Sequence, residues 1–149
     1  MENKKIESST PIYPIRTAAK LLDISIPTLR KYENEGLIIP HKSEGNQRIY
    51  SEDDLKRINC VRRAINESKI SINGIRAIYS LIPCWEVVKC SEEDREVCNA
   101  FQSHERPCWT FHHPSTTCES RDCRECEVYT KYSTCGKVKD LIKKISGLY

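Results

Sequence analysis

Residues 13–36 read YPIRTAAKLLDISIPTLRKYENEG, and this stretch decides the fold of the N-terminal half of the chain. Its first part has apolar residues at helical spacing, which places them on one face of a short helix. These residues are Ile15, Ala18, Ala19 and Leu22. The pattern is then interrupted, and a second helical segment follows. Two short helices joined by a tight turn are typical of a helix-turn-helix unit.

The turn and the ends of the second helix can also be predicted from residue types. Asp23 tolerates the left-handed conformation of a tight turn. Ser25 is a natural N-cap, and Pro27 is accepted in the first turn of a helix. Gly36 suits the position just after a helix end. We therefore predict the second helix near residues 26–35.

In a helix-turn-helix unit, the second helix enters the major groove of DNA with its N-terminal part. The sequence predicts that Leu29 points inward and that the polar side chains of this helix face outward. These polar candidates are Thr28, Arg30, Lys31 and Tyr32. A plain helical hairpin with a solvated charged face is the alternative, and this stretch alone favours neither.

The next stretch, LIIPHKSEGNQRIY at residues 37–50, predicts a small β-hairpin. A short apolar run leads to a Gly-Asn turn at 45–46, and a second strand-like run follows. A hairpin placed directly after a helix-turn-helix is a wing, which tracks phosphates or enters the minor groove. Its candidate side chains are His41, Lys42, Arg48 and Tyr50. The alternative for Arg48 is a surface ion pair with Glu44.

Two more helices follow the hairpin. The first covers residues 51–67, where Ser51 and Asp54 have the spacing of a capping box. Its apolar face consists of Leu55, Ile58, Val61 and Ile65. The second begins after the cap residue Ser71, and its stripe consists of Ile72, Ile75, Ile78, Tyr79 and Ile82. We predict that both stripes are core.

Three segments in this order, TLRKYENEGLI, QRIYSEDDL and ISINGIRAIYSLI, resemble the winged-helix DNA-binding domain of the MerR family of bacterial transcription regulators. The resemblance covers residues 12–82. It implies a sequence-specific homodimer that binds double-stranded promoter DNA, distorts it when activated and works with RNA polymerase. Carried over to this sequence, the DNA contacts come from Thr28, Arg30, Lys31 and Tyr32 on the recognition helix, and from Lys42, Asn46, Arg48 and Tyr50 on the wing.

The sequence departs from the family pattern at two places. Asp23 stands where the family usually has glycine, a change that a turn tolerates. The family usually continues with a long helix that pairs with its partner in the dimer, but here Pro83 ends the helical pattern. The resemblance therefore supports DNA binding more directly than it supports the usual mode of dimerisation.

Nine cysteines are present, and only Cys60 precedes residue 83. The others are Cys84, Cys90, Cys98, Cys108, Cys118, Cys123, Cys126 and Cys135. The tripeptide Pro-Cys-Trp occurs at 83–85 and again at 107–109, which indicates an internal duplication. So few aliphatic residues cannot build much of a core, and a bound metal or cluster would supply folding free energy of about 10 kcal/mol. We take the first seven of these eight as ligand candidates.

Residues 83–130 also resemble the two-CW cysteine-rich segments of assorted bacterial proteins, many of them sensors. Three chemistries remain open. An iron–sulfur cluster commonly takes four thiolates, and C-x4-C-x2-C at 118–126 has the spacing of three plant-type ferredoxin ligands. Zinc takes four cysteines, or three with a histidine such as His112 or His113, but C-x2-C occurs once where zinc ribbons show it twice. Thiol–disulfide switching is the third. We rank them in this order, and otherwise expect both histidines to be surface loop residues.

Charge and hydropathy limit the compartment. Residues 1–82 carry 14 Lys+Arg against 10 Asp+Glu, while residues 83–149 carry 10 against 11. No apolar run approaches the roughly 20 residues that span a bilayer, and the polar start lacks a secretory apolar core. We predict a cytoplasmic protein without membrane contact. In that compartment structural disulfides are uncommon, so the cysteines favour metal or redox chemistry.

The predicted fold class is mainly α with a small β wing: a winged helix-turn-helix domain plus a small cysteine-rich, loop-rich domain. We divide the chain into a flexible arm at 1–11, the DNA-binding domain at 12–82, a cysteine-rich sensor at 83–135 and an amphipathic C-terminal helix within 136–149. That helix either packs on its own chain or replaces the missing dimerisation helix.

The predicted function is a transcription regulator, and not an enzyme, that couples a metal, iron–sulfur or thiol-redox signal to promoter binding. One alternative keeps the regulator but makes the cysteines only a structural zinc site. The other is a thiol oxidoreductase using Cys123 and Cys126. The sequence fixes neither the signal, the operator nor the sign of regulation.

Overall fold

The computed structural model describes residues 5–134 and 136–148, so residues 1–4 of the predicted arm and Cys135 lie outside it. The N-terminal half contains β1 (Tyr13–Pro14), α1 (Ile15–Leu22), α2 (Ile26–Asn34), β2 (His41–Lys42), β3 (Arg48–Tyr50), α3 (Glu52–Asn66) and α4 (Ile72–Ser80). The C-terminal half contains α5 (Cys84–Val88), α6 (Glu92–Val97), α7 (Asn99–Gln102), the 3-10 helix η1 (Cys108–Thr110), α8 (Glu127–Tyr132) and α9 (Lys137–Ile145). The predicted class, helical with a small β wing, is confirmed.

The turn between α1 and α2 has the predicted geometry. Asp23 adopts the left-handed conformation with a φ of 54°, and its backbone N–H caps the end of α1. The Ser25 hydroxyl accepts a hydrogen bond from the Thr28 N–H at 3.2 Å. This is the N-cap interaction expected of a serine before a helix. The two helices of the predicted helix-turn-helix are therefore present with the expected ends.

The wing is the hairpin of β2 and β3, and β1 joins it as a further antiparallel strand in the order β1-β3-β2. Tyr13 lies opposite Tyr50, and His41 lies opposite Ile49. Sequence reasoning missed β1, since two residues are too few to show a strand pattern. Pro14 is tolerated there because β1 is an edge strand.

Helix α3 begins with the predicted capping box. The Asp54 N–H donates to the Ser51 hydroxyl at 3.1 Å, and the Ser51 N–H donates to Asp54 Oδ2 at 2.8 Å. Both residues are buried, which is unusual for a helix start and indicates a further role for the carboxylate. In α4 the predicted stripe is buried at Ile75 and Tyr79, but Ile78 is exposed, so that part of the prediction was wrong.

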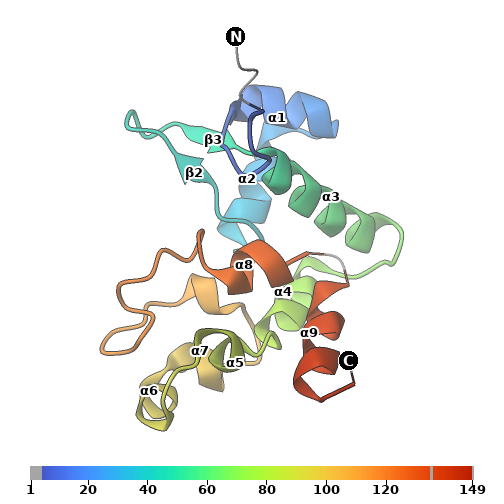
Figure 1. The fold of residues 1–149 in the computed structure, drawn as a ribbon. Coiled ribbons are helices and arrows are strands. Elements are labelled where there is room, and N and C mark those ends of the chain that lie inside the picture. Colours follow the sequence, from blue (N-terminus) through green and yellow to red (C-terminus); the bar gives the residue numbers. More distant parts are fainter. Residues whose placement is uncertain (1–4, 135, 149) are drawn as a thin grey trace.

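One continuous hydrophobic core joins the two halves of the chain. Val128, Tyr132 and Leu141 pack in the same cluster as the core of the helix-turn-helix. Figure 1 shows how this arises, because α8 lies between the winged helix and the short helices α5 to α7. The cysteine-rich half therefore packs against the winged-helix half.

Helix α9 has the predicted amphipathic pattern and packs against α8. Leu141 is buried and Val138 contacts the core, whereas Ile142 and Ile145 are exposed. This packing favours a helix that closes its own chain. A role for α9 in dimerisation remains a prediction that rests on its two exposed isoleucines.

Gly36 offers a test of the close approach between the two halves. Its φ is +75°, and a Cβ added there would collide with the Cγ2 methyl of Thr110. We expect Gly36→Ala to lower the free energy of unfolding by about 1–3 kcal/mol, from left-handed strain and from the collision. Urea denaturation would measure this loss. Adding Thr110→Ser, which removes the methyl, should recover part of it, and equal stability of the two variants would contradict the contact.

Candidate DNA-binding surface and cysteine-lined cavity

The recognition helix α2 presents part of the predicted DNA-contacting set. Arg30 and Lys31 are exposed, and Thr28 is half-buried with its hydroxyl 2.8 Å from that of Ser25. Tyr32 is a core residue. The face of α2 available to a duplex therefore carries two cations and one hydroxyl, and the inclusion of Tyr32 is corrected because its side chain is buried.

On the wing, Lys42 and Asn46 are exposed, and Asn46 is in the turn with a φ of 59°. Arg48 is half-buried, and its Nε donates to Glu33 Oε2 on α2 at 2.5 Å, so its partner is not Glu44. Tyr50 is only 1% exposed. Burial raises the pKa of its phenol to about 12. Tyr50 is therefore corrected from a DNA contact to a core residue beneath the wing.

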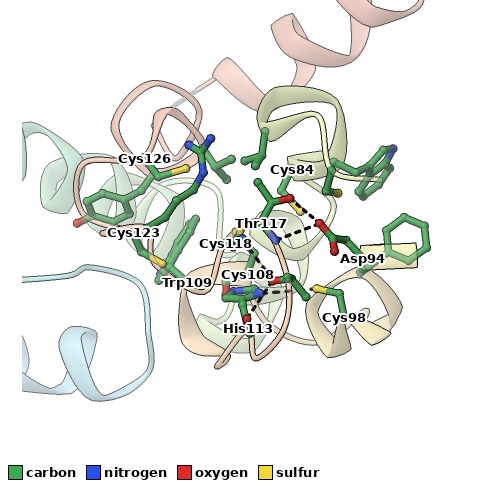
Figure 2. A pocket seen from close by; sticks show the side chains of 18 residues that line it. Cys84, Asp94, Cys98, Cys108, Trp109, His113, Thr117, Cys118, Cys123 and Cys126 are labelled. Atoms are coloured by element: carbon green, nitrogen blue, oxygen red, sulfur yellow. Dashed lines mark hydrogen bonds between the residues drawn. The ribbon is translucent and has the colours of Figure 1, made fainter. Parts of the chain in front are cut away.

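The seven cysteines predicted as ligands line one cavity (Figure 2). They come from α5, the loops around α6 and α7, η1, and the segment that leads into α8. We call residues 83–134 the cysteine module. The cavity measures about 40 Å³ as the space open to the centre of a water, which is room for a few waters at about 10–15 Å³ each. Cysteines up to 42 positions apart in sequence, from Cys84 to Cys126, are thus brought together.

The two Pro-Cys-Trp repeats meet inside this cavity. Pro83 and Pro107 are the N-cap residues of α5 and η1, so Cys84 and Cys108 are each the first residue of a short helix. The two thiols hydrogen-bond to each other, which lowers the pKa of Cys84 and, together with burial, raises that of Cys108.

Five of the thiols influence one another's pKa, and Cys90 is connected to these five only through Cys84. Burial raises the pKa of Cys118 to about 11, and the neighbouring thiols of Cys126, Cys84 and Cys123 add to the effect. The pKa of Cys108 is raised by its hydrogen bond to Cys84, by burial, and also by Cys123 and Cys126. We call Cys84, Cys108, Cys118, Cys123 and Cys126 the inner thiols. Several thiols in one cavity are the donor set that a shared metal or cluster would draw on.

His113 closes the other end of the cavity, near Cys98. Its Nδ1 is 3.6 Å from Cys98 Sγ, and its Nε2 is 2.9 Å from the carbonyl oxygen of Cys108. A carbonyl only accepts, so Nε2 carries the proton and Nδ1 accepts from the thiol. The expectation that His113 is a surface residue was wrong, whereas His112 is exposed as expected. The sequence pointed to His113 only as a possible histidine ligand beside the cysteines.

Asp94 holds the loop around Thr117 at the His113 end of the cavity. Its carboxylate accepts from the N–H of Thr117 at 3.0 Å and from the Thr117 hydroxyl at 2.5 Å. These hydrogen bonds lower the pKa of Asp94. Sequence reasoning missed this pair, because its members lie 23 residues apart in segments without regular periodicity.

Residues 13–81 match the family described as MerR HTH family regulatory protein. They form a MerR helix-turn-helix domain. The match ends just before Pro83, so the cysteine module lies outside it.

Curated relatives agree with this assignment of the MerR domain. The putative heat shock protein HspR of Streptomyces coelicolor is 32% identical over 77 residues, which is 52% of this chain and 51% of that protein. The regulator GlnR of Bacillus anthracis is 26% identical over 95 residues, covering 63% and 73% of the two chains. ZntR of Escherichia coli K12 is 31% identical over 71 residues, covering 47% and 50%. The chain thus spans about half the length of HspR and ZntR.

The donor set of the cavity fits a thiophilic group. Cysteine thiolates and an imidazole are the ligands that zinc and iron–sulfur clusters select. As the side chains stand in residues 5–134 and 136–148, no three Cys, His, Asp or Glu groups converge closely enough to hold one ion. Uptake of an ion therefore requires thiols to move toward one another.

The apolar walls of the cavity are aromatic. Trp85 packs edge-on against Phe101, with ring centroids 5.1 Å apart. Trp109 packs between Tyr79 of the MerR domain and Tyr129 of α8, at 5.6 and 5.2 Å. Through Trp109, this aromatic wall contacts the MerR domain.

The oxidoreductase alternative requires a strand that leads into Cys123-x-x-Cys126 and a helix that follows it. Helix α8 does follow, with Cys126 as its N-cap. In the described part of the chain, however, the strands all belong to the wing sheet, and none leads into Cys123.

The helices within residues 5–134 and 136–148 include none with the length and hydrophobicity of a membrane span.

Proposed function

We propose that this protein is a DNA-binding transcription regulator in which a thiophilic group, held in the cysteine-lined cavity, controls promoter binding. The observation that carries the proposal is the convergence of the seven cysteines on one cavity in a module that packs on a MerR domain. A sensing site attached to a DNA-binding domain would regulate by stabilising one of two conformations.

The DNA-binding part rests on the exposed cations and amide of α2 and the wing. Arg30 and Lys31 extend from the recognition helix, while Lys42 and Asn46 extend from the wing. Lysine and arginine side chains neutralise phosphates and release counterions, which makes affinity fall steeply with salt. Arg48 holds the wing to α2 through Glu33, so it orients the wing as well as adding charge.

For the bound group we rank an iron–sulfur cluster first, zinc second and reversible thiol oxidation third. Five inner thiols exceed the four ligands that one cluster or one zinc ion requires. They can supply a complete thiolate set without Cys90 or Cys98. In the zinc reading, His113 is available at the cavity as a nitrogen donor. In the oxidation reading, Cys84 and Cys108 are the candidate pair, because each thiol is the largest influence on the other's pKa.

The remaining parts of the proposal concern the whole assembly. By analogy with the family, the protein acts as a homodimer on double-stranded promoter DNA, with RNA polymerase as a partner, in the cytoplasm. Helix α9, with Ile142 and Ile145 exposed, is our candidate contact between subunits.

Metal and DNA measurements on one preparation test the proposal. Protein purified without oxygen should contain iron and acid-labile sulfide, and it should shift duplexes selected from a random library. A plot of log affinity against log salt should slope downward, and Arg30→Ala should make the slope shallower by about one. Arg106→Gln, an exposed change in the cysteine module, should leave it unchanged.

Other outcomes decide between the alternatives. Colourless protein with stoichiometric zinc, whose removal leaves DNA affinity unchanged in folded protein, would make the cavity a structural site. A flat response to salt would contradict the DNA-binding part. Protein without iron or zinc, in which mild oxidation changes DNA affinity reversibly, would favour the thiol switch.

A further inference from the structure

The cysteine module hydrogen-bonds to residues 36–39, the short segment that joins the recognition helix to the wing. The indole N–H of Trp109 donates to the carbonyl of Gly36 at 2.7 Å. The backbone N–H of Ile39 donates to the Tyr129 hydroxyl at 2.8 Å. The guanidinium of Arg124 donates to the Ile39 carbonyl. Three side chains of one module thus hold four residues of backbone at the start of the wing.

Arg124 also holds the other end of the wing. Its Nη2 is 2.7 Å from Asp54 Oδ2. The same carboxylate oxygen accepts the N–H of Ser51, the residue that follows β3 directly. The Arg124 side chain is only 12% exposed, so solvent screens these contacts weakly. One guanidinium therefore spans the chain before β2 and the chain after β3.

Arg124 lies between two of the inner thiols. The Cys126 N–H donates to the Cys123 carbonyl at 3.2 Å, so residues 123–126 form one tight turn. Tyr129 follows within the next turn, with its N–H donating to the Cys126 carbonyl at 3.0 Å. When Cys123 and Cys126 move to bind a group, the backbone that carries Arg124 has to move with them.

We propose that Arg124 is the residue through which the content of the cysteine-lined cavity sets the position of the wing. This inference rests on the proposed function and names the route of its regulation. A group bound by Cys123 and Cys126 fixes the turn, and Arg124 then fixes both ends of the hairpin. Loss of the group frees the turn, and the wing loses a common anchor.

The test compares loaded and chelated protein in matched variants. Arg124→Gln removes both contacts, and Arg124→Lys keeps a charge that cannot span both ends. Arg106→Gln is the control, because Arg106 is exposed and lies over the Phe111 ring at 4.1 Å, within the same module. Each protein is loaded with Zn²⁺, or reconstituted with iron and sulfide, and then chelated. Metal content, affinity for a selected duplex and hydrogen exchange at the Ile39 amide are measured in each state.

We expect loading to change the DNA affinity of the wild type and of Arg106→Gln by about 5–150-fold, the usual range of allosteric coupling. The Arg124 variants should take up the same amount of metal but bind DNA equally in both states. Exchange at the Ile39 amide should slow on loading in the wild type and in Arg106→Gln, but not in the Arg124 variants.

Each contrary result has a distinct meaning. Arg124 variants that take up metal and keep the wild-type ratio of DNA affinity between the loaded and chelated states would overturn the proposed role of Arg124 alone. So would an unchanged Ile39 exchange rate in loaded wild type, a result that needs no variant to fold. The wild type could also take up no metal or cluster and keep the same DNA affinity after oxidation. That result would overturn the proposed function and, with it, the proposed role of Arg124.

Discussion

Replacing Asp54 with alanine should lower the free energy of unfolding by about 3–5 kcal/mol, the range seen when one partner of a buried ion pair is removed. Its side chain is only 4% exposed and lies 3.2 Å from Arg57 Nη1 and 2.7 Å from Arg124 Nη2. It also completes the capping box of α3 through the Ser51 N–H. Alanine would leave two guanidinium groups poorly solvated without a counter-charge.

Urea denaturation of three variants would measure this effect. Asp53→Ala is the matched control, since Asp53 precedes Asp54 in the same first turn and is half-exposed. Its loss should cost less than about 1 kcal/mol, the worth of one charge at a helix N-terminus. Asp54→Asn keeps an acceptor for the cap but removes the charge, so its loss should be intermediate. Equal losses for Asp53→Ala and Asp54→Ala would contradict the buried ion network.

The same network shows where sequence reasoning stops. The ends of α2 and α3 could be predicted because caps and turns depend on residues three or four positions apart. Arg57 lies in the predicted helix next to an apolar stripe, where a charged residue normally faces solvent. It is buried because its partners Ser133 and Tyr129 lie 76 and 72 residues further along the chain. No local pattern carries that information.

The candidate site divides in the same way. The seven cysteines that the sequence singled out as ligand candidates do share one cavity, and their role as ligands stays a prediction. The roles of Trp109, Arg124 and Tyr129 were not predictable, because each depends on a contact with a segment 73 to 90 residues away. Tyr32 and Tyr50 were misplaced for a related reason. In a short helix or strand, the face that tertiary packing covers cannot be chosen from a few residues.

The cavity itself yields the second large effect. Cys108→Ser should lower the metal or cluster content of the purified protein, because it leaves four inner thiols and therefore no spare one for a group that takes four. The thiolate is the form that ligates zinc and iron, and a serine hydroxyl does not ionise at neutral pH. Cys108 is the inner thiol that hydrogen-bonds Cys84, and its backbone carbonyl anchors His113. Since a structural zinc contributes about 10 kcal/mol to folding, loss of the group should also loosen the module.

Cys90→Ser is the matched control for Cys108→Ser, because Cys90 lies outside the inner thiols and its thiol is influenced by only two others, Cys84 and Cys98. We expect this variant to keep its metal and its thermal stability, since five other thiols remain for a group that needs four. Chelated wild type should then melt at or below the temperature of Cys108→Ser, because chelation removes the group that Cys108→Ser keeps in part. If Cys90→Ser lost the metal while Cys108→Ser retained it, the ligands would lie at the His113 end of the cavity. Binding of the group would then not change the turn at Cys123 and Cys126, and it could not act on the wing through Arg124.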